Sequence, residues 1–486
     1  MSGLVYSTSF PPHSWSIAAW IALVPLLGAC AVLPPRRAAI AGLLWTAATA
    51  VGVAGFFPHM LADYFGLSTV PSWLAAFAII ACLHGIWIGA YAAWVAWLVR
   101  RRAADPLVLA CGWVACEFVR AHGAFGTPWA IAAYSQVGNA RIVQLADLGG
   151  PYAIGLLLAA VNAVVAALLI PALRGRRPRS SATLVAAALA AALIYGEWRL
   201  GQTFADGPAI GVAVVQGGAP VAPARRAARL AHYAALTAAG VRPSTSLIVW
   251  PESAVEGYLD EATPARDAVM RVAAAAPGGL ILGGPHYEAS TSGTRYHNSA
   301  YVVRDGRVAG RYDKHRLVPV AEDGRLTWLA GASTPRYAAG SGSFLLSAAG
   351  LRVGALLCIE GMFPELAHQA VREGAEVLVT LSNDAWFGDA AAARQQLDIA
   401  TLRAVEQRRY LVRAAATGIS AVVDAHGQVL EQSAFDTDAV LNATLRAAHA
   451  RSPYQRLGDA VAWTVIAVAA GATVRARIAR STPSTQ

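Results

Sequence analysis

Long apolar runs constrain this chain more than any other feature of its sequence. The hydrocarbon core of a bilayer is about 30 Å thick, so a helix that crosses it needs roughly 20 apolar residues. The candidate spans are 15–33, 38–57, 72–99, 106–122, 151–173, 182–200 and 457–474. The fourth is the weakest, because Glu117 and Arg120 lie inside it. These runs predict a multi-span membrane protein.

The composition agrees with this prediction. Of 486 residues, 56% are hydrophobic and only 14% are charged, whereas an ordinary globular chain is about 25% charged. Such a composition argues against a wholly soluble protein, long disorder and collagen-like repeats. The formal net charge of +10 could indicate a nucleic-acid partner, so the positions of the positive charges have to decide.

Arginines gather after alternate spans. Loops on the cytoplasmic side of a membrane carry an excess of Lys and Arg. The clusters are Arg36 and Arg37, Arg100 to Arg102, Arg174 to Arg179, and Arg475 to Arg480. They follow spans one, three, five and seven, so we expect those loops and the C-terminal tail to be cytoplasmic. Much of the net charge then marks topology, and no nucleic-acid partner is predicted. One miscounted span would break this alternation.

The sequence pattern changes between residues 205 and 450. There charged residues are frequent, and short β-rich runs alternate with Ala- and Arg-rich helical stretches. We therefore expect a membrane domain of about six helices over 1–204 and an extracytoplasmic catalytic domain over 205–450. A C-terminal transmembrane helix and cytoplasmic tail would occupy 451–486. The sequence shows neither a signal peptide with a small-residue cleavage site nor a short internal repeat.

Two residue types are used sparingly. Four of the five cysteines fall in the apolar spans, and Cys358 is the only one in the outer domain. Lys314 is the only lysine in a chain that otherwise uses arginine. CxxC and other metal-ligand spacings are absent, so we predict no cofactor.

Three segments of the outer domain carry groups suited to nucleophilic catalysis. Glu252 follows an apolar strand in Val249-Trp250-Pro251-Glu252-Ser253, Lys314 lies in Tyr312-Asp313-Lys314-His315, and Cys358 ends the apolar run 353–357. A thiol attacks as thiolate and needs a base, which a partly desolvated glutamate can supply. A lysine ammonium is a compact charge that can stabilise an oxyanion in a pocket where the planar guanidinium of arginine fits differently.

Each of these residues also has an ordinary structural interpretation. A lone strand-end cysteine is usually a packed core residue, a glutamate after Trp-Pro a turn or cap residue, and a single lysine a surface residue. Their joint occurrence favours a Glu-Lys-Cys catalytic set. The sequence has no GxSxG, HExxH or P-loop motif, so the common alternatives lack their motifs.

The three segments resemble the nitrilase, or carbon–nitrogen hydrolase, superfamily. Together with Phe363-Pro364-Glu365, Ser382-Asn383-Asp384-Ala385-Trp386-Phe387-Gly388 and the apolar N-terminal region, they resemble the apolipoprotein N-acyltransferase family. The resemblance runs over nearly the whole chain and includes Pro128-Trp129 and Tyr134-Ser135-Gln136. It implies a multi-span α-helical membrane domain followed by an α/β nitrilase-like αββα sandwich domain.

The resemblance also implies a mechanism. Glu252 would be the base, Lys314 the oxyanion-stabilising group and Cys358 the nucleophile, with Glu322 and Glu360 as supporting glutamates. In the family's ping-pong reaction the cysteine takes an acyl chain from a phospholipid as a thioester. The acceptor is the α-amine of a lipoprotein's diacylglyceryl-cysteine. The implied location is the bacterial inner membrane, with the catalytic domain on the periplasmic side.

The chain departs from the family pattern at several places. The usual Cys-Tyr-Glu is Cys358-Ile359-Glu360, a histidine is replaced by Gln396, and Gln216-Gly217-Gly218 replaces Gln-Gly-Asn, with Arg225 near the place of a tryptophan. The loop that holds Glu322 reads Val320-Ala321-Glu322-Asp323-Gly324 and is followed by a short segment. The family usually has one more N-terminal span. These departures affect the substrate more than the chemistry.

Three functions therefore compete. The first is lipoprotein N-acylation by the route just described. The second is a membrane-anchored nitrilase-like amidase or acyltransferase that acts on another amine or amide, which the altered loops motivate. The third is a non-enzymatic binding module, against which the intact Glu-Lys-Cys set argues.

Overall fold

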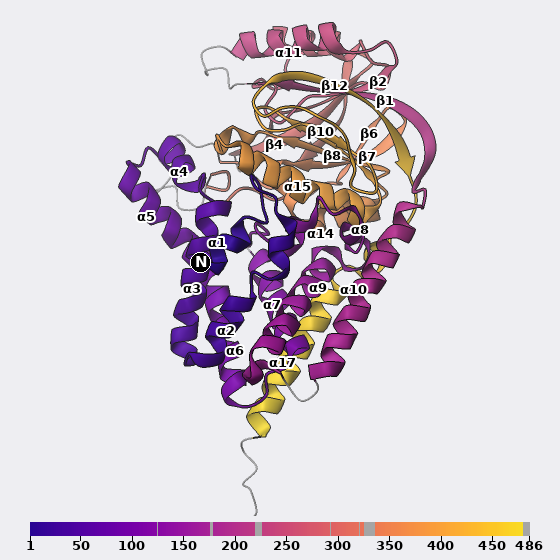
Figure 1. Cartoon of the computed structure of the whole chain (residues 1–486). Helices are drawn as coiled ribbons and strands as arrows, with labels where there is room; N and C mark the ends of the chain where they lie inside the picture. Colours follow the sequence, from indigo (N-terminus) through magenta and orange to yellow (C-terminus); the bar gives the residue numbers. More distant parts are fainter. Residues whose placement is uncertain are drawn as a thin grey trace, which may run out of the picture. The chain divides into compact units, whose positions relative to one another are not determined.

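The computed structural model describes residues 1–123, 125–174, 178–218, 226–291, 293–319, 321–324 and 336–479. The chain divides into two compact units. A helical unit comprises Met1–Gly201 and Arg456–Gln486, and an α/β unit comprises Gln202–Gln455 (Figure 1). Each is described by itself.

The helical unit is built from apolar helices. They are α1 (Ser2–Ser7), α2 (Val24–Val32), α3 (Pro35–Val53), α4 (Phe57–Phe65), α5 (Thr69–Ile80), α6 (Ile86–Arg100), α7 (Pro106–Ala121), α8 (Ala140–Val143), α9 (Ala146–Leu169), α10 (Pro178–Leu200) and α17 (Ala460–Ile478). A π-helical turn over Ala81–Gly85 joins α5 to α6. Many carry apolar side chains on every face, as is typical of membrane-embedded helices.

Among the described residues, four helices are long and apolar enough to cross a membrane. They are Thr69–Arg100, Ala146–Leu169, Arg179–Leu200 and Ala460–Ile478, and the bent pair Pro35–Val53 and Phe57–Asp63 would make a fifth. The sequence predicted seven. The run 15–33 is instead a 3-10 turn at Ser16–Trp20 followed by α2. A new helix begins around Pro25 because proline has no backbone N–H to donate to the turn before it. The run 106–122 is α7, with only 16 residues.

The two charged residues of α7 bind the segment that follows the helix. A carboxylate oxygen of Glu117 accepts the backbone N–H of Ala132 at 2.8 Å. The guanidinium of Arg120 donates to the carbonyls of Trp129 at 2.8 Å and Ala130 at 3.0 Å. Charges inside a membrane-spanning region are expensive unless they are paired or bonded to backbone, and these two serve the non-helical backbone around Pro128-Trp129.

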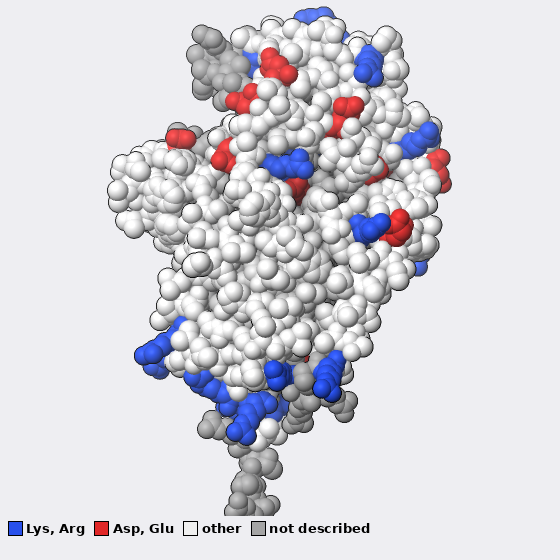
Figure 2. Space-filling view, viewed as in Figure 1, with Lys and Arg blue, Asp and Glu red and all other residues white. Residues whose placement is uncertain are grey.

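Basic side chains gather at one end of the helical unit, as Figure 2 shows. Arg100 donates to the carbonyl of Leu33 at 2.8 Å, and Arg101 donates to the carbonyl of Ala476 at 2.9 Å. The C-terminal ends of α2, α6 and α17 therefore lie together, and they bring three of the predicted arginine clusters to the same end.

The α/β unit contains two six-stranded sheets. One has the order β12-β1-β2-β3-β4-β5 and the other β11-β10-β9-β8-β7-β6. The strands of the first are β1 (Ala205–Gly217), β2 (Thr245–Val249), β3 (Leu280–Ser290), β4 (Gly293–Arg304), β5 (Arg307–Asp313) and β12 (Asp438–Ala448). Those of the second are β6 (Leu345–Ala348), β7 (Leu351–Leu357), β8 (Val377–Ser382), β9 (Tyr410–Ala415), β10 (Ala421–Val423) and β11 (Val429–Gln432).

The sheets are the inner layers of a four-layer sandwich. One apolar core joins β1, β2 and β4 of the first sheet to β7, β8 and β9 of the second and continues to α14 (Pro364–Glu373) and α15 (Ala390–Gln407). A second core packs α11 (Arg226–Gly240) and α12 (Pro264–Ala273) on the other face of the first sheet. The predicted αββα arrangement is confirmed (Figure 1).

The parallel strands lie at the middle of each sheet. Strands β1, β2 and β3 run parallel in the first sheet, and β7, β8 and β9 run parallel in the second. Ligands of α/β sheets bind beyond the carboxyl ends of such strands. Glu252, Cys358 and Asn383 follow β2, β7 and β8, so this edge is where a site is expected.

A buried ion pair supports this edge. Arg413 of β9 bonds Asp384 at 2.7 Å and the side-chain oxygen of Gln396 at 2.9 Å, and Ser382 donates to Asp384 at 2.5 Å. All four side chains are buried. Gln396, one of the positions that departs from the family pattern, therefore belongs to this internal network.

We expect Arg413→Met to destabilise the α/β unit, because the substitution leaves the carboxylate of Asp384 buried without its cation. Removing one partner of a buried pair costs about 3–5 kcal/mol, which corresponds to a fall of roughly 10 °C in the midpoint of thermal unfolding in detergent. Arg446→Met is the matched control, because the exposed Arg446 donates only to the carbonyl of Gly207. Equal midpoints for the two variants would contradict this account.

Candidate active site

Three short loops place the residues predicted for catalysis. Glu252 lies three residues beyond β2, Lys314 follows β5 directly, and Cys358 follows β7 directly. The three side chains come from both sheets, and all are buried. The fold thus assembles groups that are far apart in the sequence.

Glu252 is held by three hydrogen-bond donors. Its Oε1 accepts from Asn298 Nδ2 at 2.7 Å and lies 3.4 Å from Lys314 Nζ, and its Oε2 accepts the backbone N–H of Asn383 at 2.9 Å. A Cβ atom on Gly283 would lie 2.6 Å from Glu252 Cα, so the neighbouring strand approaches this closely only with glycine there. Glu252 is fixed both by its backbone packing and by its side-chain partners.

Lys314 is shared between two carboxylates. Its Nζ lies 2.9 Å from Glu322 Oε2 and 3.4 Å from Glu252 Oε1. Its backbone N–H donates to the carbonyl of Asn298 at 2.9 Å. The side chain is only 1% exposed, so the ammonium is removed from water and depends on these partners.

Glu322 completes the charged cluster. Its Oε1 accepts from Asn298 Nδ2 at 3.0 Å, and its Oε2 accepts the backbone N–H of Val318 at 2.7 Å. The predicted supporting glutamate is therefore in direct contact with the lysine. Val320 lies outside the described residues.

Cys358 begins a short 3-10 helix in an uncommon conformation. Its φ is +51°, a left-handed value that side chains with a Cβ rarely adopt. Such backbone conformations cluster at functional sites, because the surrounding structure has to enforce them. The charges of Glu252 and Lys314 both act on the thiol, so the three groups share one electrostatic environment.

Glu360 ties the lysine loop to the cysteine turn. It is fully buried. Its carboxylate accepts the backbone N–H groups of His315, Arg316 and Leu357 at 2.7 to 2.9 Å and the hydroxyl of Tyr312 at 2.8 Å. One carboxylate thus holds the backbone just after Lys314 and just before Cys358, and it holds the side chain of Tyr312.

The charges of the site shift the pKa values in a consistent way. Burial raises the pKa of Glu252, and Lys314 partly offsets the shift. Burial alone would lower the pKa of Lys314, but Glu322 and Glu252 outweigh it and hold that pKa well above its usual value. Burial and the nearby Glu252 raise the pKa of the Cys358 thiol. Burial and the neighbouring charges thus favour the protonated forms of all three groups, and the pKa of Glu252 is the one that Lys314 partly brings back down.

The sequence did not point to two further partners of Glu252. Asn298 lies within β4, and only the register of the β3–β4 and β4–β5 hairpins brings it beside the loop that holds Lys314. The backbone N–H of Asn383 reaches Glu252 because β8 ends beside β7. Asn383 belongs to the motif 382–388 named above, but the sequence motif does not show that its backbone N–H is the group that binds Glu252.

Of the other altered positions, Gly218 directly follows β1, and Ile359 directly follows Cys358. Gly218 adopts a φ of +60°, and a Cβ there would lie 2.9 Å from Asp438 Oδ1. Ile359 is half-buried next to the nucleophile. Arg225 lies outside the described residues.

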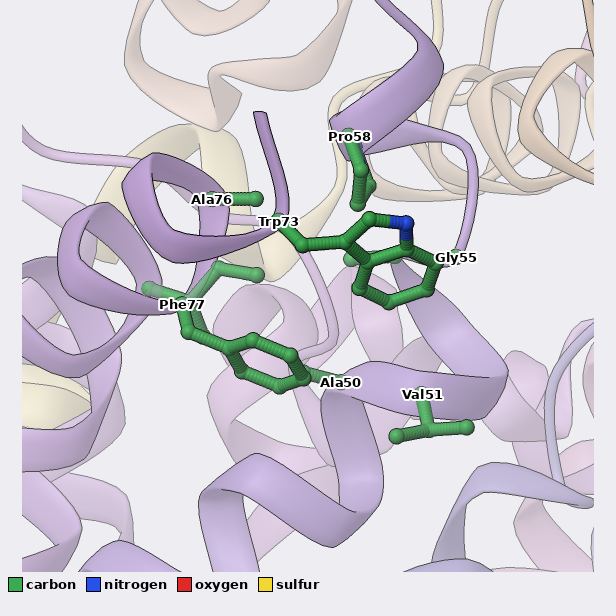
Figure 3. A pocket seen from close by; sticks show the side chains of 9 residues that line it. Ala50, Val51, Gly55, Pro58, Trp73, Ala76 and Phe77 are labelled. Carbon is green, nitrogen blue, oxygen red and sulfur yellow. The ribbon is translucent and has the colours of Figure 1, made fainter. Parts of the chain in front are cut away.

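A polar pocket of about 40 Å³ borders Glu252. It is lined by Gly217, Gly218, Arg229, His232, Tyr233, Glu252, Ser253, Asn383, Ala416 and Thr417. A pocket in the helical unit, shown in Figure 3, is lined instead by apolar residues around Trp73 and Phe77. The apolar pocket has no titratable side chain, so it offers no acid–base chemistry.

Among the residues that the structure describes, no group of three or more His, Cys, Asp or Glu side chains is arranged to hold a metal ion. The carboxylates of the site are occupied by Lys314, Asn298 and backbone N–H groups.

Residues 211–453, which include most of the four-layer sandwich, match the carbon–nitrogen hydrolase family model. Residues 2–164 match the model of the apolipoprotein N-acyltransferase N-terminal domain. The chain belongs to the apolipoprotein N-acyltransferase family.

Whole-chain relatives agree with both matches. The chain is 33% identical to the apolipoprotein N-acyltransferase of Geobacter metallireducens, over 97% of this chain and 93% of that protein. It is 30% identical to that of Methylococcus capsulatus, over 96% and 93%. The crystal structure of Saccharomyces cerevisiae Nit3, a nitrilase superfamily member, aligns with 50% of this chain and 92% of its own, at 21% identity and a TM-score of 0.39.

We expect Lys314→Arg to abolish acyl transfer although it keeps the positive charge. The site buries a compact ammonium between two carboxylates, and a guanidinium is larger, planar and rigidly forked. The loss should be at least about 100-fold in kcat, the scale found when one oxyanion donor is removed. Arg446→Lys, a change of the same kind at an exposed arginine, is the control. Near-normal turnover by Lys314→Arg would refute the proposed role of the ammonium.

Proposed function

We propose that this protein transfers an acyl chain from a phospholipid, through a thioester on Cys358, to the N-terminal amine of the diacylglyceryl-cysteine of lipoproteins. The main support is the ammonium of Lys314, buried between Glu252 and Glu322 next to the turn of Cys358 in a chain of this family. A glutamate base, a cation and a cysteine are the groups that two successive acyl transfers need.

The first transfer would form the thioester. Glu252 takes the proton of the Cys358 thiol as sulfur attacks the ester carbonyl of the phospholipid. The carbonyl oxygen becomes an oxyanion, which the ammonium of Lys314 stabilises. The intermediate then breaks its bond to the glycerol oxygen, and Glu252 returns the proton to that oxygen. A lysophospholipid leaves, and the acyl chain stays on sulfur.

The second transfer would regenerate the enzyme. The acceptor amine attacks the thioester carbonyl, Lys314 again faces the oxyanion, and Glu252 accepts a proton from the attacking nitrogen. The carbon–sulfur bond breaks, an amide forms, and the proton returns to sulfur. Each acyl transfer ends with the cluster in the charge state in which it began, because Glu252 gives up the proton that it has taken.

The location follows from the arginines. We place the basic end of the helical unit on the cytoplasmic face, as the positive-inside rule requires. We propose the bacterial inner membrane as the location, with the α/β unit on the periplasmic side.

A second candidate is a membrane-anchored nitrilase-like amidase or acyltransferase with another amine or amide substrate. The polar pocket beside Glu252 favours it, because Gly218, where the chain departs from the family pattern, lines that pocket. The same catalytic groups would serve, and only the acceptor would differ.

An acyl adduct on Cys358 is the direct test of the first transfer. We expect the purified full-length protein, mixed with phospholipid vesicles, to gain the mass of one acyl chain on the peptide that contains Cys358, with release of lysophospholipid. Cys358→Ser should give no stable thioester, and Cys111→Ser, at a cysteine of α7, should behave as the unchanged protein. Absence of the adduct from the unchanged protein would refute phospholipid as the donor.

Complementation tests the acceptor. In a bacterium depleted of its own apolipoprotein N-acyltransferase, this chain should restore triacylated lipoproteins, and Glu252→Gln should not. If an adduct forms on Cys358 but the lipoproteins stay diacylated, the second candidate is favoured.

A further inference from the structure

We infer that Asn298 is a positioning residue that binds Glu252 and Glu322 together beside Lys314 and keeps Glu252 competent as the base. This inference rests on the proposed function, because it assigns Asn298 a part in the proton transfers described above. The observation behind it is that one amide nitrogen donates to both carboxylates of the site, at 2.7 Å and 3.0 Å.

Asn298 also fixes the backbone of the lysine. Its carbonyl accepts the N–H of Lys314 at 2.9 Å, while its side chain reaches the two glutamates that contact Lys314 Nζ. Asn298 lies in the middle of β4, opposite Pro285 of β3, and is 7% exposed. A strand interior of this kind gives a side chain little freedom, so the amide is preorganised.

The donors and acceptors of the site explain why an amide side chain suits position 298. The Nδ2 group of asparagine has two hydrogens and no charge, and here it faces two carboxylates. With a neutral thiol, Glu252, Glu322 and Lys314 together carry one surplus negative charge. Asn298 and the backbone N–H groups of Asn383 and Val318 stabilise this charge without adding a second cation. A second cation would lower the basicity of Glu252, and Glu252 needs that basicity to accept a proton.

The charged and titratable groups around Glu252 define the expected pH dependence. They are Lys314 after β5, Glu322 in the next loop, the thiol of Cys358 after β7, and the phenol of Tyr337. Burial raises the pKa of Glu252, and the hydrogen bond from Asn298 opposes the rise. Without that donor the pKa rises further, so less of the base is ionised at neutral pH. The acidic limb of the activity profile must then move to higher pH.

The second contact of Asn298 links the base to the loop of Glu322. The backbone of Glu322 is held by Val318 and Tyr337, with its N–H donating at 2.9 Å and its carbonyl accepting at 2.8 Å. Asn298 is the neutral side chain that connects this loop to Glu252. Loss of Asn298 and loss of the Glu322 carboxylate should therefore overlap in effect.

The test uses Asn298→Leu, which keeps the approximate shape and removes both donors, and Asn298→Asp, which also adds an acidic group. The readout is the rate at which a small alkylating reagent modifies Cys358 in the full-length protein, followed by mass spectrometry of that peptide from pH 5 to pH 10. We expect the acidic limb to move up by at least about one pH unit in both variants. On the acidic side of the limb, a shift of one pH unit lowers the rate about tenfold, with recovery at alkaline pH.

Asn442→Leu is the matched control. Asn442 is an asparagine of β12, at the edge of the sheet opposite β5, and its amide donates to the carbonyl of Gly240 at 2.9 Å. Its profile should coincide with that of the unchanged protein. A uniform loss of rate at every pH in both Asn298 variants would show a merely structural role and overturn the inference, as would an unchanged limb.

A double variant checks the shared contact. We expect Asn298→Leu combined with Glu322→Gln to lose less activity than the product of the two single losses, because contacting residues in one network are not additive. Strict additivity would contradict the link between the two carboxylates. Alkylation needs no lipid, so failure of acyl transfer and failure of this inference give separate results.

Discussion

The ammonium of Lys314 is buried between the carboxylates of Glu252 and Glu322, and much of the α/β unit is arranged so that this charge can stay there. Taking an ion out of water costs several kcal/mol even after relaxation. The site offsets this cost with two carboxylates, and it holds each carboxylate with neutral donors from Asn298, Asn383 and Val318. The strands β2, β4, β5 and β8 all have to end or pass at the right place for these bonds to form.

Glu360 does not contact the ammonium, but it holds the loop that carries Lys314. A loop that holds a buried lysine has to be rigid, because a shift of about 1 Å would separate the ammonium from its partners. The carboxylate of Glu360 accepts backbone N–H groups on the lysine loop and just before Cys358, and it accepts the Tyr312 hydroxyl as well. The backbone beside Cys358 and the backbone beside Lys314 are thus held by one common group. Because one carboxylate binds both loops, it fixes the position of one loop relative to the other.

The helical unit follows a different physical rule. In an apolar environment backbone polar groups must be satisfied within the protein, and Glu117 and Arg120 of α7 bond the backbone at 129–132. Two charges that are unusual in a membrane span are therefore the hydrogen-bond partners of the segment that follows the helix. The same pattern explains why counting apolar runs gave more spans than there are long helices. Apolar composition reports burial, whereas the length of a helix depends on where proline and polar contacts interrupt it.

The sequence by itself determined the class of fold, the two-part organisation and the identity of five candidate site residues. These predictions rest on local properties, namely the length of apolar runs, the arginine clusters and the residue types at strand ends. Such properties can be recognised directly in the amino-acid sequence. Only the tertiary structure decided that Glu322 touches Lys314, that Glu360 acts through backbone, and that Asn298 bridges two carboxylates. Those contacts depend on hairpin register and on which strands become neighbours across two sheets. They arise from long-range packing of the whole α/β unit, which no local pattern encodes.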